Sequence, residues 1–397
     1  MHATDDIKPA LERAIQLGAS CAQCPLKDLQ GPVYFKPKAV DSGYDFDITV
    51  VAERPGDTEL GAGQPLAGRS GWLLQKMLKE MHVTNPQVHL TNATLCTTST
   101  LLQDKSWSAA VNCCRPRLAN ELSNNRRQLV FLLGKRALQA VTGKDSIKAW
   151  RGFPVSPLEL FDRENTIYFP TYHPAHILRE AAYAAVWKLD FARAFAYASG
   201  KLKPVEWPRT LVDDDETTAA ALEGILHSVE ARPTELGLDV ETAGKEPMLV
   251  DLLCIGLASK ELALSLPLHS RVADVNGLFR RILSHHNAQF ITQNGIHDLL
   301  SLEAHNFHHL RIAFDTLTAA RIAYPRIDHA LGTVASLHHF IPRHKAQYRS
   351  GDADTKGENA WGKAAKDPSK FRAMRIYNAR DAWTTLMCKE PLERMLG

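Results

Sequence analysis

The chain has 397 residues, enough for two or three domains, and its 45% hydrophobic and 23% charged content is typical of a globular protein. Short, interrupted apolar stretches exclude a membrane span, and the N-terminus lacks a secretory signal pattern, so we expect a cytoplasmic protein without a membrane partner. The net charge of +3 is uneven: residues 1–203 carry 25 basic and 19 acidic side chains, and residues 204–397 carry 22 and 25. A basic half favours a polyanionic partner, and an acidic half favours bound metal ions.

In chain order, the first half alternates apolar runs with helical patterns, which predicts an α/β domain. Strands are expected at 46–53, 87–95, 128–134 and 166–173. Helices are expected at 71–81, 109–123 and 183–199, and Pro116 disturbs the second of them. Prolines and an acidic run at 200–218 predict the linker and the entry into a second unit.

The second half is also α/β but shows no repeat of the first. Strands are expected at 234–240, 252–258, 261–268 and 288–294, and helices near 296–305, 315–323 and 371–388. The polar stretch 342–370 is expected to be a mobile loop. Its basic residues are Arg343, Lys345, Arg349, Lys356, Lys363, Lys366 and Lys370, and it also contains Trp361. Such a loop could hold single-stranded DNA by charge and stacking, or be only a solvated surface.

Two acidic side chains lie two residues apart on the strand expected at 234–240 and its continuation. Side chains alternate along a strand, so Asp239 and Glu241 point to the same side. Two carboxylates in this arrangement repel each other unless a hard cation lies between them, and Mg²⁺ or Mn²⁺ with oxygen ligands fits that position. Alone, such a pair is more often an edge pair or a solvated bend.

Two later segments add polar pairs at helical spacing. Asn294 and Asp298 are four residues apart at the start of a helix, and Tyr377 and Asp381 share a face of the last helix. A Tyr–Asp pair alone is a common exposed pair. Together, four carboxylates and a phenol from three segments are the groups that a two-metal phosphodiester hydrolase requires.

In these motifs, residues 205–397 resemble the DEDD-type proofreading exonucleases of the tyrosine subclass, close to the exonuclease domain of family A DNA polymerases. The connecting stretch 314–325 is also similar. The resemblance implies a ribonuclease H-like mixed sheet and 3′→5′ exonuclease activity. It also implies that Asp239, Glu241, Asp298 and Asp381 bind two metal ions. Tyr377 would orient the attacking water, and Asn294 would support the site or touch the substrate strand.

Cysteines form the main pattern of the first half. The chain has seven cysteines, and an odd number argues against a disulfide framework. Cys21 and Cys24 form a CxxC pair, followed by Cys96 and the adjacent Cys113 and Cys114. Four thiolates suit either Zn²⁺ or a [4Fe–4S] cluster, and their spacing does not distinguish the two.

Three further motifs each lie at the end of an expected strand: AERPG, LTNATLC and TYHPAHIL. In the cysteine pattern and these motifs, residues 18–195 resemble the family 4 uracil-DNA glycosylases. The resemblance implies a parallel-sheet domain with a [4Fe–4S] cluster on Cys21, Cys24, Cys96 and Cys114, with Cys113 as the alternative to Cys114. Asn92 would read the uracil edge of an extruded base. His173 would stabilise charge that develops on the uracil, and Glu53 would position water or support the cationic sugar.

Two departures from that family concern the site. Leu66 stands in the run GQPLAG where the family has an aromatic side chain that stacks on the flipped base, and CTTS follows Cys96 in place of the usual CRPP. Stacking contributes about 1–3 kcal/mol, so weakened uracil capture is expected. The alternative is a catalytically silent glycosylase-like module that binds DNA or docks a polymerase. A vestigial scaffold is disfavoured by the complete set of nuclease residues.

The sequence therefore predicts an α/β protein with a glycosylase-like domain at 1–203 and an exonuclease domain at 204–397. Its expected substrate is DNA, single-stranded or at 3′ ends. The domain order resembles the N-terminal part of some phage family A polymerases, which implies the cytoplasm of a bacterial or phage-infected cell. The chain ends soon after the third nuclease motif, so a separate DNA polymerase chain is the expected partner.

Overall fold

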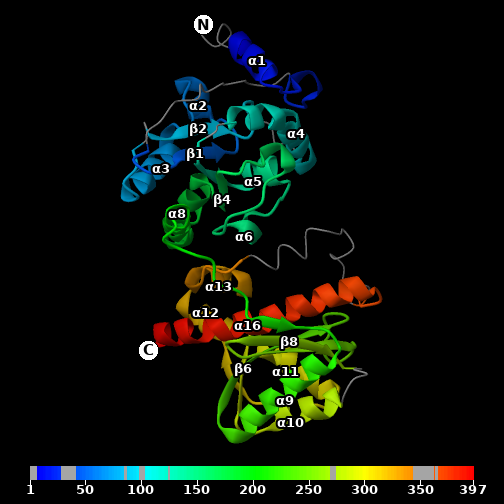
Figure 1. Cartoon of the computed structure of the whole chain (residues 1–397). Coiled ribbons are helices and arrows are strands. Elements are labelled where there is room, and N and C mark those ends of the chain that lie inside the picture. The colour runs from blue at the N-terminus through cyan, green and yellow to red at the C-terminus, as the bar shows by residue number, and fades with distance from the viewer. Residues whose placement is uncertain are drawn as a thin grey trace. The chain divides into compact units, whose positions relative to one another are not determined.

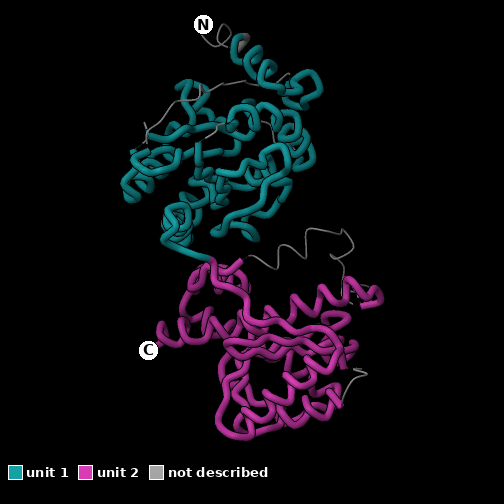
Figure 2. Tube along the Cα trace, in the orientation of Figure 1, with its two compact units in different colours: residues 1–203 teal, residues 204–397 magenta. Residues whose placement is uncertain are grey.

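The computed structural model describes residues 7–27, 42–84, 87–97, 103–123, 126–268, 274–342, 362 and 365–397. The chain divides into two compact units, Met1–Lys203 and Pro204–Gly397 (Figure 2). Among the residues described, none of the helices combines the length and apolar character that a bilayer crossing requires.

The first unit is built on a parallel sheet of four strands (Figure 1). In the order of the sheet they are β2 (His89–Asn92), β1 (Asp47–Ala52), β3 (Gln128–Leu133) and β4 (Thr166–Thr171). The predicted parallel-sheet α/β class is confirmed, although β2 is shorter than the predicted 87–95. Strands β1 and β3 are buried along their whole length, as expected for a parallel sheet covered on both faces.

Helices connect these strands and cover the sheet. They are α1 (Ile7–Gln16), α2 (Asp57–Ala62), α3 (Gly68–Glu80), α4 (Asp104–Glu121), α5 (Lys135–Thr142), α6 (Ile147–Trp150), α7 (Pro174–Arg179) and α8 (Ala184–Ala198). Short 3₁₀ turns lie at η1 (Cys21–Gln23), η3 (Glu159–Phe161) and η4 (Ala181–Tyr183). Helix α8 packs on β3 and β4, where the rings of Phe131 and Phe191 stack with centroids 4.4 Å apart.

Helix α4 differs from the prediction because it begins five residues earlier and continues through Pro116. Proline removes one backbone donor, but tertiary contacts hold the helix on both sides of it. Arg115 donates from Nε to the carbonyl oxygen of Ala140 in α5 at 2.8 Å, and Arg117 is fully buried.

The second unit contains a mixed sheet of six strands, which confirms the predicted fold class. In the order of the sheet these are β10 (Ile312–Asp315), β9 (Ala288–Thr292), β6 (Thr234–Thr242), β7 (Leu252–Ala258), β8 (Leu262–Pro267) and β5 (Arg209–Leu211). Strand β7 runs antiparallel to both neighbours, whereas the other pairings are parallel. The edge strands β5 and β10 were not predicted, because three or four residues carry too little alternation to be recognised.

The helices of the second unit lie on both faces of this sheet. They are α9 (Glu216–Ala231), α10 (Val275–Ser284), α11 (Gly295–Ala304), α12 (Thr316–Ala323), α13 (Leu331–His338) and α16 (Pro368–Leu396). Strand alternation sends Leu236, Leu238 and Val240 into a core with α9 and α10. The intervening residues of β6, among them Asp239 and Glu241, therefore face the side on which α16 lies (Figure 1).

Helix α16 lies very close to the centre of the sheet because small residues face it. A Cβ atom on Gly237 would lie 2.0 Å from the carbonyl oxygen of Ala382, and one on Gly256 would lie 2.6 Å from Oδ1 of Asn378. Neither position has room for a side chain. The two glycines therefore allow α16 to place its polar residues against β6 and β7.

Candidate functional site

In the second unit, two of the predicted carboxylates project from β6 as expected. Asp239 and Glu241 are half-buried, whereas Val240 between them is buried in the opposite core. The two therefore share one face of the strand, with Gly256 and Cys254 beside them on β7.

Asp298 is attached to the same strand by a hydrogen bond. It lies in the first turn of α11, is 4% exposed, and its Oδ1 accepts from the backbone N–H of Val240 at 3.1 Å. Burial raises the pKa of Asp298 to about 7, and the charge of Asp315 adds to this effect. A carboxyl group in this state is stabilised in its charged form by a nearby cation.

Tyr377 and Asp381 are both buried in α16, 5% and 2% exposed, as expected for one helical face. Between them lies Asn378, which the sequence analysis did not identify. Its Nδ2 donates to the carbonyl oxygen of Asp239 at 3.0 Å and to Oδ2 of the same residue at 2.8 Å. Its Oδ1 accepts from Ser265 at 2.6 Å. Asn378 thus joins α16 to the Asp239 carboxylate.

Asn294 does not share a face with Asp298, contrary to the prediction. It is the exposed N-cap residue of α11, with a left-handed φ of +68° and no capping bond from its side chain. The helix begins only at Gly295, so the i, i+4 rule for helix faces does not apply to Asn294.

The three segments that carry the predicted nuclease residues therefore meet through Val240 and Asn378. Within the described ranges, however, no three His, Cys, Asp or Glu side chains are arranged to hold a metal ion. Of the loop predicted at 342–370, most residues, including Trp361, lie outside the described residues. Lys366 and Lys370 are exposed, and Lys370 belongs to the first turn of α16 rather than to a loop.

In the first unit, the strand register brings the predicted glycosylase residues to one edge. Ala52 pairs with Asn92, and Leu133 pairs with Thr171 at the same level of the parallel sheet. At these strand ends, or one or two residues beyond them, lie Glu53, Asn92, Gly134 and His173. This is the carboxyl edge, where α/β sheets place ligand sites.

Asn92 is completely buried, and neither polar atom of its amide has a hydrogen bond of acceptable geometry. Glu59, which the sequence analysis missed, lies next to it and accepts from the backbone N–H groups of Gly56, at 3.1 Å, and of Leu66. Burial raises the pKa of Glu59, although these backbone bonds and the Asn92 amide lower it in part. An unsatisfied buried amide of this kind is ready to bind a polar ligand.

Leu66 is also buried and forms the turn before α3 with a left-handed φ of +52°. Its carbonyl oxygen lies where a Cβ atom of residue 71 would be, at 1.3 Å, so only glycine fits at Gly71. The turn therefore packs tightly, with an aliphatic side chain in place of an aromatic one.

His173 is the N-cap residue of α7, and its Nδ1 accepts from the backbone N–H of Ala175 at 3.1 Å. Burial lowers the pKa of His173, and Glu53 opposes this shift in part. The neutral ring must then carry its proton on Nε2, because Nδ1 acts as an acceptor. His173 can therefore donate a hydrogen bond from Nε2 without being charged.

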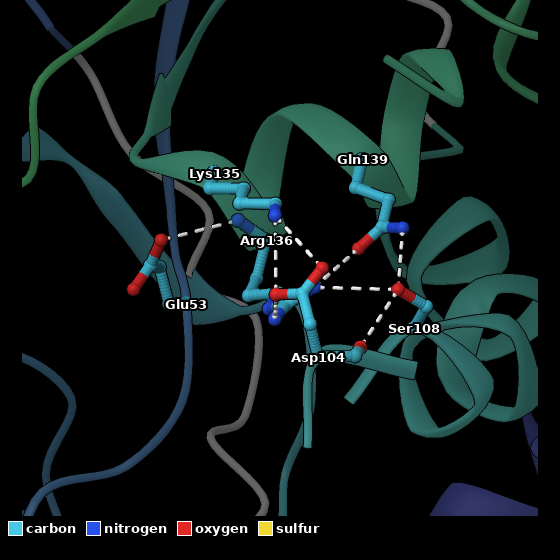
Figure 3. Close-up of polar contacts among 6 residues, drawn as sticks. All are labelled: Glu53, Asp104, Ser108, Lys135, Arg136 and Gln139. Carbon is cyan, nitrogen blue, oxygen red and sulfur yellow. Dashed lines mark hydrogen bonds and ion pairs between the residues drawn. The ribbon is translucent and has the colours of Figure 1, made fainter. Parts of the chain in front are cut away.

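Glu53 is held at the start of α5, as Figure 3 shows. Its Oε1 accepts from the backbone N–H of Arg136 at 3.1 Å. Gly134, with φ +91°, has no room for a Cβ atom, which would lie 2.5 Å from that oxygen. Nearby, Lys135 and Arg136 both bind the carboxylate of Asp104. Glu53 is thus fixed by backbone geometry rather than by an ion pair.

The five cysteines of the first unit gather around η1 and α4. Cys24, Cys96 and Cys113 pack together, and all five thiols are free. Burial and the neighbouring thiols raise the pKa of Cys24 to about 11 and of Cys96 to about 12. Both Cys113 and Cys114 contribute to the raised pKa of Cys21, so either of them could be the fourth metal ligand. The Sγ of Cys24 accepts from the backbone N–H of Leu26 at 3.4 Å.

Both units match models of known protein families. Residues 41–194 match the uracil DNA glycosylase superfamily, and residues 212–397 match a 3′-5′ exonuclease family of the DNA polymerase A type. The type-4 uracil-DNA glycosylase of Sulfurisphaera tokodaii is 28% identical over 192 residues, which are 46% of this chain and 83% of that protein. The type-4 enzyme of Thermotoga maritima is 29% identical over 161 residues, 40% of this chain and 78% of that protein.

Among solved structures, Escherichia coli RNase D, an exoribonuclease, is 17% identical with a TM-score of 0.34, covering 48% of this chain and 45% of that one. Brucella melitensis NrnC with bound Mg²⁺ is 18% identical with a TM-score of 0.32, covering 48% and 82%. Likenesses this distant carry no argument about substrate. By the family matches, the chain joins a domain of the uracil-DNA glycosylase superfamily to a 3′–5′ exonuclease domain.

Proposed function

We propose that the second unit trims the 3′ ends of DNA with two Mg²⁺ or Mn²⁺ ions, as a proofreading-type nuclease of the tyrosine subclass. The observation that supports this most is the pair of contacts that brings three distant segments together. Asp298 accepts from Val240, and Asn378 donates to Asp239.

By their chemistry the donors suit such ions, since all are carboxylate oxygens and one of them, Asp298, is a buried acid with a raised pKa. In the described residues, however, no three of these side chains converge as metal ligands, so the proposal requires them to move together when the ions bind. Asp239, Glu241, Asp298 and Asp381 would hold the ions. When bound, the ions lower the pKa of the attacking water and stabilise the leaving oxygen. Tyr377 orients that water from its buried position on α16, and the exposed Asn294 contacts the substrate strand.

A labelled oligonucleotide tests this activity and its direction. A single strand labelled at its 5′ end should be shortened stepwise from the 3′ end with Mg²⁺ or Mn²⁺, and remain intact with EDTA. Parallel RNA and DNA strands decide the preferred substrate. Cleavage in EDTA, or shortening from the 5′ end, would contradict the proposal.

The first unit, in the same proposal, removes uracil from DNA. The completely buried amide of Asn92 supports this, because its donor and acceptor match those that the uracil edge offers. His173 donates from Nε2 to the uracil oxygen on which negative charge develops. Glu53, held at the start of α5, positions water or supports the cationic sugar.

The cysteines fit a metal centre by their chemistry. Cys24, Cys96 and Cys113 pack in one cluster, the thiols of Cys21 and Cys114 interact electrostatically with this group, and a backbone N–H already points at the sulfur of Cys24. In a [4Fe–4S] cluster each thiolate binds a different iron, so the sulfurs need not converge on one point. Cys21, Cys24, Cys96 and Cys114 would bind this cluster, which would hold η1, the end of β2 and α4 together; Cys113 and Zn²⁺ are the alternatives.

Two measurements test the first unit. A uracil-containing strand should yield an alkali-sensitive site, whereas a matched thymine strand should not. The protein should be brown and contain about four iron atoms per chain. If metal analysis instead finds one zinc ion per chain and no iron, the cysteines bind Zn²⁺ rather than a cluster.

A silent glycosylase-like module is the second candidate, and Leu66 is the observation that favours it. Its aliphatic side chain gives an extruded base no ring to stack on. DNA binding without any uracil release would select this candidate.

We also propose a separate DNA polymerase chain as partner, in the cytoplasm of a bacterial or phage-infected cell. The order of the two domains supports this. Co-elution with the cognate polymerase tests it, and independent elution of the two proteins would count against it.

A further inference from the structure

We propose that Arg117 is a positioning residue that fixes the base-reading end of β2 and joins it to α4, the helix that bears Cys113 and Cys114. The proposal rests on the glycosylase function of the first unit. Arg117 is completely buried, which is uncommon for an arginine and requires specific partners.

The guanidinium of Arg117 bonds three consecutive residues at the end of β2. Its Nη2 donates to the carbonyl oxygens of Asn92 at 2.7 Å and Ala93 at 3.1 Å, and its Nη1 donates to Oγ1 of Thr91 at 3.3 Å. Strand β2 lies at the edge of the sheet, so these carbonyl groups have no strand partner on that side. One rigid fork therefore determines the backbone position from which the Asn92 side chain projects.

The charge of Arg117 is balanced within the same buried network. Its Nη1 bonds Oε2 of Glu121 at 2.5 Å, and Oε1 of Glu121 lies 3.1 Å from Nε2 of His89. Apolar residues of similar size could pack α4 on the sheet as stably as a buried ion pair. What apolar residues could not replace is the set of bonds to the strand end, and this is the contribution that we assign to Arg117.

The segments that Arg117 joins also carry metal-binding candidates. Cys96 follows Asn92 by four residues, and Cys114 precedes Arg117 by one helical turn. Arg117 also acts electrostatically on the thiols of Cys21 and Cys96, lowering pKa values that burial raises. A centre that binds Cys96 and Cys114 would thus clamp the two segments that the guanidinium links.

The test is a double-mutant cycle of the full chain with Arg117→Lys and Asn92→Ala. Lysine keeps the charge but lacks the planar fork, so Arg117→Lys should slow single-turnover uracil release about tenfold or more. In the Asn92→Ala background the same change should have little further effect, because it acts through Asn92. Iron content, visible spectrum and trimming of 3′ ends should match the wild type.

Equal slowing in both backgrounds, or no slowing, would overturn the proposal. Loss of iron from Arg117→Lys would assign the residue to the metal centre instead and would also overturn it. If Arg117→Lys fails to fold, the pair Arg117→Met with Glu121→Gln, which leaves neither of these two charges buried without the other, takes its place in the cycle.

Hydrogen exchange separates this proposal from the glycosylase function itself. Arg117→Lys should speed amide exchange in the peptide 89–97 and leave the β3 peptide 128–133 unchanged. Amide exchange can be measured even if the wild type releases no uracil. Unchanged exchange in the peptide 89–97 would overturn the positioning role of Arg117.

Discussion

The two units place their candidate sites on different kinds of structure. In the second unit, acidic side chains project from strand β6 and from helices on the two faces of the sheet, Asp298 from α11 and Asp381 from α16. In the first unit, the site lies at the strand ends, in turns such as Leu66 and Gly134 with left-handed backbone. The proposed nuclease site thus depends on close packing of regular elements, and the proposed glycosylase site depends on turn geometry.

The most severe test of this difference is Asp239→Ala. It removes one carboxylate from the face beneath α16 and should reduce trimming of 3′ ends by more than about a hundredfold. Uracil release should be unchanged, because Asp239 belongs to the second unit alone. An equal loss of both activities would show that the two sites do not act separately.

A smaller effect is expected from Asn378→Asp, which places a second carboxylate against Oδ2 of Asp239. Apparent Mg²⁺ affinity should change by about 10–100-fold, as for other partners of metal ligands. The matched control is Ser265→Ala, which removes only the hydrogen bond to Oδ1 of Asn378 and should cost less. A Mg²⁺ titration of nuclease rate gives both values, and equal effects would contradict the role of the amide.

In the first unit, Leu66→Phe should strengthen capture of an extruded uracil about tenfold, because a ring adds stacking. Binding of uracil-containing and thymine-containing strands would show whether the gain is specific. Leu66→Ala serves as control and should show no gain. If Leu66→Phe has no effect, the flipped base does not reach this turn.

The smallest effect concerns stability against pH. Burial raises the pKa of Asp298 from 3.8 to about 7, so the fold favours the neutral acid. Its contribution is complete below about pH 4 and is lost as the pH rises through 7. Without divalent ions, the melting temperature should fall by a few degrees between pH 5 and 8 relative to Asp298→Asn. A parallel pH response in the two proteins would argue against the shifted pKa.

The difference between the units also explains what the sequence could predict. Asp239, Glu241, Tyr377 and Asp381 lie on a regular strand and a regular helix, where periodicity alone gives the shared face. Asn294 was wrongly placed on such a face because it is the N-cap residue, one position before the first helical residue, and its backbone is left-handed. The fold class followed from alternating strands and helices, but β5 and β10 are too short to show a pattern.

Asn378, Glu59 and Arg117 were missed for another reason. Each acts through a partner that is distant in sequence or lies in a turn, so no spacing rule points to it. What marks these residues is that each is polar and buried inside a motif. Burial is seen in the folded structure and cannot be read from the sequence. The need for glycine at Gly237 and Gly256 could not be predicted for the same reason, because it arises from the close approach of α16 in the folded structure.

The close packing of α16 against its sheet has a consequence for synthesis on the ribosome. This helix follows every strand of its sheet in the chain, yet it carries Tyr377, Asn378 and Asp381, which we assign to the proposed nuclease site. While a chain grows, its earlier parts can fold first. If the proposed nuclease site is correct, the nascent protein would be unable to degrade nucleic acid until α16 has emerged and docked, well after the first unit could have folded.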